Sequence, residues 1–331
     1  MAINVRDVAE RARVSVGTVS NVLNAPAKVA EGTAERVHAA IAELGFVRND
    51  AARQLRAGSS RTIGLVVLDV RNPFFADVSR GAEIRATEAG LSVLLANSDE
   101  QAERESAHLD LFEEQRVRGI LISPVGDTMQ QLERLRSHGI PSVLVDRLAT
   151  TPGFSSVSVD DVDGGMQAVR HLLAIGRRRI LFVGGPLDLA QVRDRLRGAR
   201  QAVAEVEGAR LTVLPIAALT VSQGVAAGRE ILALHDPPDA VFAANDLVAL
   251  GVLQGVGLIG GPRVPEQLAI VGYDDIDFAA WAAVPITSVR QPRELLGSIA
   301  LDLLTAEIEG KPERQRVVLK PELVVRGSTV A

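Results

Sequence analysis

The chain has 331 residues, of which 47% are hydrophobic and 23% are charged, and its net charge is −5. This composition is typical of a globular protein of two or three domains and unlike that of a disordered chain. The absence of cysteine excludes disulfides, thiolate metal sites and cysteine nucleophiles, and the five scattered histidines form no His-Glu-x-x-His motif.

Neither a membrane span nor a signal peptide is apparent in the sequence. No run approaches about 18 consecutive apolar residues, and the first residues, MAINVRDVAERA, lack a charged segment followed by an apolar one. We therefore expect a cytoplasmic protein that does not contact a membrane. No nucleophile–base pair or metal-ligand spacing indicates catalysis or a bound cofactor, so we do not expect an enzyme.

The charge is unevenly distributed along the chain. Residues 1–61 contain nine Lys and Arg against six Asp and Glu, a net charge of +3, which leaves −8 on the remaining residues. A basic head on an acidic body is typical of a protein whose head meets a polyanion, although a small domain also reaches this charge by chance.

Three short helices are predicted in residues 1–47. Asn4 is positioned to cap the first helix, and Ser15 is positioned to cap the second, VGTVSNVLN. Helical spacing of apolar residues predicts the third helix over 31–44, and Gly45 is its stop signal. This arrangement is typical of a helix-turn-helix module.

The outer face of the second predicted helix carries small groups in place of the Lys, Glu and Arg of most surface helices. Its members are Val16, Gly17, Thr18, Ser20, Asn21 and Asn24. Small hydrogen-bonding groups suit close contact with a flat polar surface, such as the base edges and phosphates of a DNA major groove. The pattern alone also fits an ordinary three-helix bundle whose polar face is merely solvated.

Residues 48–56, RNDAARQLR, form a predicted hinge. They offer Asn49 as a helix cap but only about two helical turns, well below the roughly 12–15 residues that make an isolated helix marginal in water. We expect this segment to be largely unfolded until it docks. Leu55 has no evident core to fill and is a candidate wedge for a minor-groove base step. The following AGSSR, residues 57–61, is predicted to be a flexible linker.

From residue 62 onward, β-rich runs alternate with helical segments, which predicts an α/β body with two doubly wound parallel-sheet lobes. The first series includes TIGLVVLDV, LSVLLAN, RGILISP, PSVLVD and SSVSVD, and the second includes RRILFVGG, LTVLPI, DAVFAAND and LAIVGYDD. Near-continuous apolar strands between helices indicate sheets covered on both faces. Two such lobes place a cleft at the carboxyl ends of their strands, where such folds bind ligands.

Polar residues at the predicted strand ends are candidates for that cleft. They are Asp146, Asn245, Asp246, Asp274 and Asp275. Carboxylates in such positions accept paired hydrogen bonds from the hydroxyls of a polyol. For Asp246 a role as helix cap and for Asp275 a role in a turn are favoured instead, because Asp often serves in both. Asn245 and Asp274 are harder to explain in that way.

Three segments resemble a known family. VRDVAERARVSVGTVSNVLN, the helix ending IAELGF, and RNDAARQL together resemble the DNA-binding head and hinge of the lactose-repressor and purine-repressor (LacI/GalR) family of bacterial transcription regulators. The resemblance continues over nearly the whole chain. It implies base contacts for Val16, Gly17 and Asn21, and intercalation of Leu55 at the centre of a palindromic operator. Further DNA contacts are expected at Ser15, Thr18, Ser20, Asn24, Lys28 and Asn49.

The same resemblance implies an effector cleft between two lobes of the periplasmic-binding-protein type. The residues expected there are Phe74, Phe75, Asp146, Arg195, Asn245, Asp274 and Gln291. The two phenylalanines match a position that packs on the ligand, although either also suits the core. Trp281 is a further candidate at the rim. The stretch near Leu219 lacks the aromatic residue that covers the ligand in some relatives.

The expected domain division follows from the linker and the resemblance. It assigns 1–47 to the helix-turn-helix domain, 48–61 to the hinge helix and linker, and 62–331 to the effector-binding and dimerisation domain. Within this last domain, the first lobe comprises about 62–160 plus 291–320, and the second lobe comprises about 161–290 plus 321–331. The chain then crosses between the lobes three times, which provides a hinge that can close on a ligand. No leucine-heptad tail follows RGSTVA, so a homodimer is expected.

Three positions depart from the family pattern. Arg13 stands at the turn where the family usually has Gly or Asn, so a mildly strained positive φ is expected there. Ala30 stands where Ser or Thr usually caps the third helix, which should weaken that cap by about 1 kcal/mol. Gly17 offers no side chain for base readout, so the operator sequence of a relative is not transferable.

The sequence therefore predicts a dimeric, ligand-gated transcription regulator, with a repressor as the favoured form. Its expected partners are a double-stranded DNA operator and a small-molecule effector, for which carboxylates with few aromatics favour a sugar or sugar derivative over a purine. One alternative is a periplasmic-type solute-binding protein without a DNA role, which would need an export signal and has no use for residues 1–60. A second is a nucleotide-using α/β enzyme, but GVGLIGG at 255–261 lacks the strand-loop-helix context and the Lys of a P-loop.

Overall fold

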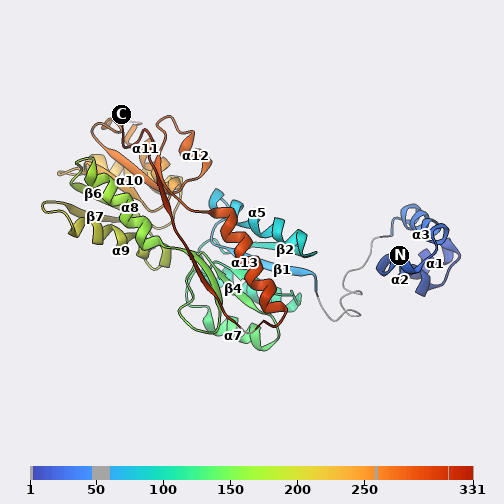
Figure 1. Ribbon diagram of the computed structural model, residues 1–331. Helices are drawn as coiled ribbons and strands as arrows, with labels where there is room; N and C mark the ends of the chain where they lie inside the picture. Colours follow the sequence, from blue (N-terminus) through green and yellow to red (C-terminus); the bar gives the residue numbers. More distant parts are fainter. Residues whose placement is uncertain (1–2, 47–59, 258–259, 312, 331) are drawn as a thin grey trace. The chain divides into compact units, whose positions relative to one another are not determined.

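The computed structural model describes residues 3–46, 60–257, 260–311 and 313–330. The chain divides into two compact units, Met1–Ser59 and Ser60–Ala331, here called the head and the body (Figure 1). Asn49 and Leu55 lie outside the described residues, so their roles remain predictions. Among the helices of the described ranges, none is long and apolar enough to cross a membrane.

The described head consists of three α-helices with a short 3-10 helix after the second. Their bounds are α1 Val5–Ala12, α2 Val16–Asn24, η1 Pro26–Lys28 and α3 Glu31–Leu44. One side of each α-helix contributes to a shared apolar core, whose buried members are Val8, Ala9, Ala12, Val19, Val22, Val37 and Ala40. The core therefore fixes α2 against the other two helices.

The ends of the head helices agree with the sequence analysis. The Asn4 side chain caps α1, and Ser15 Oγ accepts a hydrogen bond from the Thr18 N–H at 3.0 Å. Arg13 has a φ of 55°, in the left-handed region that favours glycine. Ala30 makes no side-chain cap bond to α3. Both expected departures from the family pattern are confirmed.

The first lobe of the body, the N-lobe, has a six-stranded sheet of order β11-β5-β4-β3-β1-β2 in which the strand pairs are parallel. Its strands are β1 Thr62–Val67, β2 Ser92–Asn97, β3 Ile120–Ile122, β4 Ser142–Val145, β5 Ser155–Val159 and β11 Arg316–Leu319. Its helices are α5 Pro73–Glu88, α6 Ala102–Glu114, α7 Met129–Ser137 and α13 Arg293–Ile308.

The second lobe, the C-lobe, has a six-stranded sheet of order β12-β10-β9-β8-β6-β7, parallel except for the antiparallel edge pair β10 and β12. Its strands are β6 Arg179–Gly184, β7 Arg210–Pro215, β8 Ala240–Ala243, β9 Ala269–Asp274, β10 Thr287–Arg290 and β12 Glu322–Val324. Its helices are α8 Asp161–Ala174, α9 Ala190–Ala204, α10 Val221–Ala233, α11 Asp246–Gly257 and α12 Asp277–Ala280.

Helices cover both faces of each sheet. In β1, Ile63 and Leu65 pack with buried residues of α5 and α13, whereas Val66 packs with buried residues of α6 and α7. In β6, Leu181 packs with α10 and α11, and Phe182 with α8 and α9. Successive strand residues thus enter different cores, which is why the strands are apolar throughout. The predicted fold class is confirmed.

Two features of the body position the cleft. The chain passes between the two sheets three times, after β5, β10 and β11. Helices α8 and α9 pack closely because each has a glycine at the contact. A Cβ at Gly165 or Gly198 would overlap the backbone of the other helix. This close approach brings Asp161, at the start of α8, beside Arg195 of α9.

Candidate functional site

The outer face of α2 is the first candidate site. Val19 and Val22 are buried in the head core, so the opposite side of the helix is turned outward. Of the predicted DNA contacts, Ser15, Val16, Gly17, Asn21, Asn24 and Lys28 are exposed, and Thr18 and Ser20 are half-buried. Small uncharged groups on an exposed helix permit close approach to a polar surface and leave hydrogen-bonding groups accessible to it.

A cavity between the two lobes of the body is the second candidate site. Of the residues predicted for the effector cleft, those that line it are Phe74, Phe75, Asp146, Arg195, Asn245 and Asp274. Gln291 does not line it, but its Nε2 donates to Asp274 Oδ1 at 2.8 Å. Trp281 is 79% exposed and lies outside the lining, whereas Leu219 is part of it.

Arg195 is the centre of a buried polar cluster in the C-lobe. Its Nε donates to Asp161 Oδ1 at 2.8 Å, and its Nη1 donates to the Ala244 carbonyl at 2.7 Å and lies 3.8 Å from Asp274 Oδ1. The guanidinium also lies over the Tyr273 ring, 3.7 Å from its centroid. These contacts hold the guanidinium in one position, with Asp274 turned toward the cavity.

Two sets of hydrogen bonds join the lobes across the cavity. Asn72 Nδ2, from the N-lobe, donates to Asp274 Oδ2 of the C-lobe at 3.0 Å. Gln191 Nε2, on α9 of the C-lobe, donates to the carbonyl and to Oδ2 of Asp146 in the N-lobe, at 2.8 and 3.0 Å. Asp146 and Asp274 have φ values of 55° and 102°. Such strained conformations are typical of functional positions.

The cavity carboxylates are shifted toward their protonated forms. Burial raises the pKa of Asp146 well above its ordinary value and the neighbouring Asp161 adds to the rise, while Arg195 opposes it. Burial also raises the pKa of Asp274, against the effects of Arg195 and Asn72. A ligand that forms hydrogen bonds to Asp146 or Asp274 is therefore expected to change the protonation of that carboxyl group.

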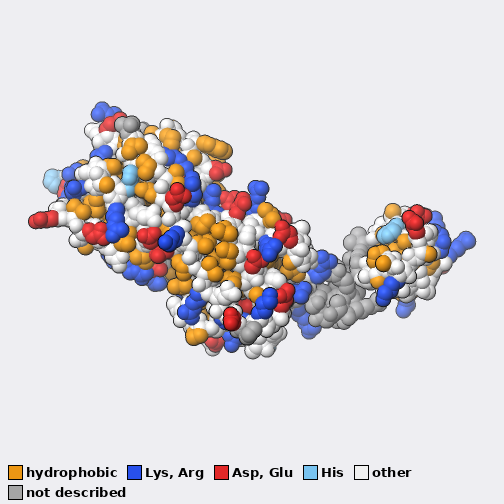
Figure 2. Space-filling view, viewed as in Figure 1, with side chains coloured by type: hydrophobic (Ala, Val, Ile, Leu, Met, Phe, Trp, Pro, Cys, Tyr) orange, Lys and Arg blue, Asp and Glu red, His pale blue; other side chains and the backbone are white. Residues whose placement is uncertain are grey.

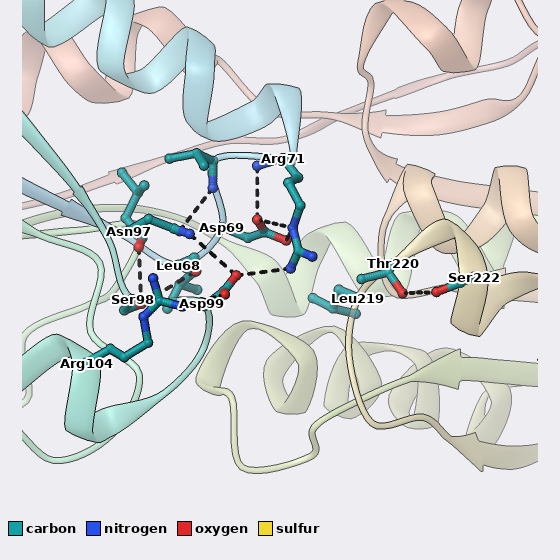
Figure 3. Close-up of polar contacts among 12 residues, drawn as sticks. Leu68, Asp69, Arg71, Asn97, Ser98, Asp99, Arg104, Leu219, Thr220 and Ser222 are labelled. Carbon is teal, nitrogen blue, oxygen red and sulfur yellow. Dashed lines mark hydrogen bonds and ion pairs between the residues drawn. The ribbon is translucent and has the colours of Figure 1, made fainter.

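The cavity rim in the N-lobe carries charged residues that pair with one another (Figure 3). Arg71 Nε lies 2.9 Å from Asp69 Oδ1, and Arg71 Nη2 lies 3.1 Å from Asp99 Oδ1. Arg104 Nη1 lies 2.7 Å from Asp99 Oδ2. Figure 3 places Leu219 opposite this group on a separate loop. The rim cations are therefore held in ion pairs.

The predicted role of Asp246 as the cap of α11 is wrong, because its neighbour Asn245, which also lines the cavity, is the cap. Asn245 Oδ1 accepts from the Val248 N–H at 2.9 Å, so Asn245 caps α11. Asp246 accepts from the Ser288 hydroxyl at 2.6 Å and the Ile276 N–H at 2.8 Å, which ties α11 to β10 and to the segment after β9. Asp246 is the first residue of α11, and its buried carboxylate stabilises the packing of the C-lobe.

The other aspartate expected in a turn, Asp275, has a second role. It has a φ of 55°, consistent with a turn. Its carboxylate lies 2.6 Å from Arg326 Nη1 and 2.7 Å from Arg290 Nε. Asp275 thus ties the end of β9 to β10 and to the segment after β12.

Several cavity residues were not predicted from the sequence. They are Asn72, Gln191, Glu100 and Asp69, and Asp161, which accepts from Arg195, was not predicted either. The sequence Asn72-Pro73 is a recognisable helix start, and Asn72 Oδ1 accepts from the Phe74 N–H at 3.0 Å. Its second bond, to Asp274, has no local signal because it depends on how the lobes face each other. The same holds for Gln191.

Comparisons with known proteins identify the families of the head and of the body. Residues 4–49 match the family model of bacterial regulatory proteins, lacI family, and residues 169–329 match that of the periplasmic binding protein-like domain. The chain is 32% identical, over 98% of each chain, to the HTH-type transcriptional repressor PurR of Photobacterium profundum. It is 34% identical to the ribose operon repressor of Halalkalibacterium halodurans, over 98% of this chain and 96% of that protein.

Solved structures give the same result. A lac repressor dimer bound to operator and an anti-inducer matches with a TM-score of 0.86 and 28% identity over 100% of both chains. A complex of the transcriptional regulator CelR with cellobiose matches with a TM-score of 0.72 and 36% identity, over 98% of this chain and 99% of that one. The chain therefore belongs to the lacI family of bacterial regulatory proteins and is a DNA-binding transcriptional regulator with a periplasmic-binding-protein-like body.

Proposed function

We propose that this protein represses transcription as a homodimer, gripping a palindromic operator with α2 of each head and changing its grip when a sugar binds in the cavity of the body. The observation that carries the proposal is the pair of cross-lobe bonds, Asn72 to Asp274 and Gln191 to Asp146, in a chain that also presents an exposed small-residue helix. A ligand in the cavity must compete with or reinforce those bonds, which couples its binding to lobe closure.

The head supports insertion of α2 into a major groove. Val16 and Gly17 are exposed at the start of the helix, where recognition helices of this kind meet the base edges, and Asn21 is exposed one turn further along. Ser15 and Thr18, at the helix N-terminus, are placed to bond to phosphates. Leu55 is the proposed minor-groove wedge between paired hinge segments.

Exposed apolar side chains support a dimer. Leu94 and Leu95 lie on the edge strand β2 and are 42% and 46% exposed, while Ile84 of α5 and Leu295 of α13 are each 49% exposed. Hydrophobic side chains also gather in patches on the face of the body seen in Figure 2. An uncovered apolar edge strand invites association with another chain, and a second copy would cover it. A two-fold dimer is also what a palindromic operator requires.

The effector is proposed to be a sugar. Solved structures of relatives contain ribose and cellobiose, and the cavity here offers Asp and Asn oxygens beside two phenylalanines. Closure of the lobes on such a ligand would alter how two N-lobes pair, and hence whether the hinges meet. The expected coupling between the two sites is about 1–3 kcal/mol per effector.

A solute-binding protein without a DNA role is the alternative, and one experiment separates the two. The full chain is used to select duplexes from random DNA, and the bound fraction is sequenced. The proposal expects an inverted repeat, lost when residues 1–59 are deleted while ligand binding by the remaining body persists. Failure to enrich any symmetric site, with ligand binding intact, would favour the alternative.

A further inference from the structure

The charges that line the cavity are unbalanced. Asp69, Glu100, Asp146 and Asp274 contribute four carboxyl groups, whereas Arg195 is the one basic residue in the lining. Arg195 is itself already engaged, since Asp161 and the Ala244 carbonyl accept hydrogen bonds from its guanidinium. An incoming anionic group would therefore find acceptors and no unpaired cation.

At three helices that begin at the cavity, a side-chain cap already occupies a first-turn N–H group. Asn72, Thr220 and Asn245 accept hydrogen bonds from first-turn N–H groups of α5, α10 and α11. Helix α9 begins without a side-chain cap, but Asp188 stands two residues before its first residue. A phosphate at this helix end would lie beside a carboxylate.

The residues at the cavity rim also disfavour an anionic ligand. Arg71 and Arg104 are paired with Asp69 and Asp99 (Figure 3), and no hydrogen bond or ion pair joins Glu100 to another side chain of the described residues. Burial raises the pKa of Glu100 to about 7 and the charge of Asp69 adds to the rise, while Arg71 opposes it. Glu100 thus adds to the cavity lining a carboxyl group that no side chain of the described residues pairs with directly.

Arg147, which follows Asp146 in the chain, does not change this charge balance. It lines a separate N-lobe pocket together with Met129 and Leu148, not the interlobe cavity. Its half-buried side chain therefore offers no cation to a ligand held between the lobes.

Two buried acceptors in the cavity lack donors. Asp146 is 3% exposed and Gln191 is 6% exposed, and both line the cavity. Gln191 uses its amide hydrogens on Asp146, which leaves Asp146 Oδ1 and Gln191 Oε1 without a hydrogen-bond partner in the described structure. Buried polar atoms are normally paired, and a hydroxyl suits this point because it can donate to Gln191 Oε1 and can donate to Asp146 Oδ1 or accept its proton.

We infer that the cavity selects an uncharged, unphosphorylated sugar that presents two neighbouring hydroxyl groups to Asp146 Oδ1 and Gln191 Oε1, and that it rejects the phosphate ester of the same sugar. This inference rests on the proposed function and narrows its ligand class. Gln191 then contributes to sugar specificity in two ways: its amide group donates to Asp146 across the lobes, and its Oε1 accepts a hydrogen bond from the ligand.

The first experiment is a paired screen on the full chain. Thermal shift and calorimetry compare D-ribose with D-ribose 5-phosphate, D-glucose with D-glucose 6-phosphate, and cellobiose with its 6-phosphate. The inference expects a free sugar to bind at least about 100-fold more tightly than its ester. An ester that binds as tightly as the free sugar, or more tightly, overturns the inference and leaves the proposed function standing. Absence of binding by every sugar and ester overturns the proposed effector and the inference with it.

The second experiment assigns the donor pair. Deoxy analogues of the sugar that binds are compared on the wild-type protein and on Gln191→Leu, with Arg200→Gln, an exposed change on the same helix, as control. Removal of the hydroxyl that faces Gln191 should cost about tenfold in the wild type and in the control but little in Gln191→Leu. Equal losses in all three proteins contradict the assignment of Gln191.

Discussion

The exposed face of α2 and the interlobe cavity differ both in their side chains, small and uncharged against largely charged, and in what those side chains contact. Asn21 and Val16 stand on the surface of a helix that an apolar core holds in place. Asp146, Asp274 and Arg195 are buried and bonded to neighbours, partly across the two lobes. The side-chain bonds of the α2 face are local to one helix, whereas some of the cavity bonds join two lobes and must be exchanged or reinforced when a ligand enters. The first arrangement suits recognition and the second suits a switch.

The largest expected effect comes from breaking the cavity cluster at its centre. Arg195→Ala leaves Asp161 buried without its guanidinium, so unfolding of the body should become easier by about 3–5 kcal/mol, and the effector response should be lost. Urea unfolding of the full chain measures the first quantity. Arg193→Ala, an exposed change on the same helix, is the control and should cost less than about 0.5 kcal/mol. Equal stability of the two variants contradicts the role given to Arg195.

Glu105, a buried carboxyl group outside the cavity, tests whether a buried polar group without an ion pair stabilises or destabilises the body. Glu105 is fully buried, and its Oε2 accepts from the Val125 N–H at 2.7 Å while Oε1 has no partner in the described structure. Burial raises the pKa of Glu105 from 4.5 to about 7. Because the folded protein holds this proton more tightly than the unfolded chain, stability should fall as pH rises from about 4.5 to about 7 and level off above.

The matched variant is Glu105→Gln, which keeps an oxygen for Val125 and removes the charge. It should be more stable than the wild type by about 2–3 kcal/mol at pH 8, with a difference that shrinks toward pH 5. Melting temperatures across this range measure the difference. A constant gap between the two proteins at all pH values excludes the titration of Glu105 as its cause.

On the head side of the comparison, Asn21→Ala should weaken operator binding by about 10- to 100-fold without changing ligand binding in the body. The variant loses the hydrogen bonds from Asn21 to a base edge, and such bonds determine which DNA sequence is recognised. Fluorescence anisotropy with operator and with random duplex separates the two kinds of binding, and only the operator affinity should fall. His38→Ala, an exposed change on α3, is the control. A parallel loss on random DNA reassigns Asn21 to the phosphate backbone.

The smallest expected effect concerns the missing cap of α3. Ala30→Ser supplies a side-chain acceptor for the first turn of α3 and should stabilise the head by about 1 kcal/mol. Hydrogen exchange of the α3 amides should slow in the variant and that of the body should stay the same. Unchanged exchange in α3 indicates that Ser does not adopt the capping conformation there.

The sequence predicts the head better than the cavity for a physical reason. Helix spacing and the caps at Asn4 and Ser15 are local patterns, so α3 lies where it was predicted, over Glu31–Leu44. Strand-end polarity identified Asp146 and Asp274 as cavity residues from the parallel-sheet pattern alone.

The remaining cavity residues depend on contacts between distant segments. Arg195 was identified only by resemblance, because on its own it is a charge on a helix. Gln191 and Asn72 were not predicted, since their cavity bonds depend on the mutual placement of two sheets. The cap of α11 was assigned to Asp246 instead of Asn245 because the predicted helix began one residue too late.

The most direct test of the account is the affinity of the full chain for its selected symmetric duplex, measured by anisotropy with and without the sugar that binds the body. We expect the sugar to change that affinity by about 5- to 150-fold, and Asp274→Ala to remove the change while it keeps the affinity measured without sugar. An affinity that stays the same when the sugar is bound would contradict the coupling between cavity and head.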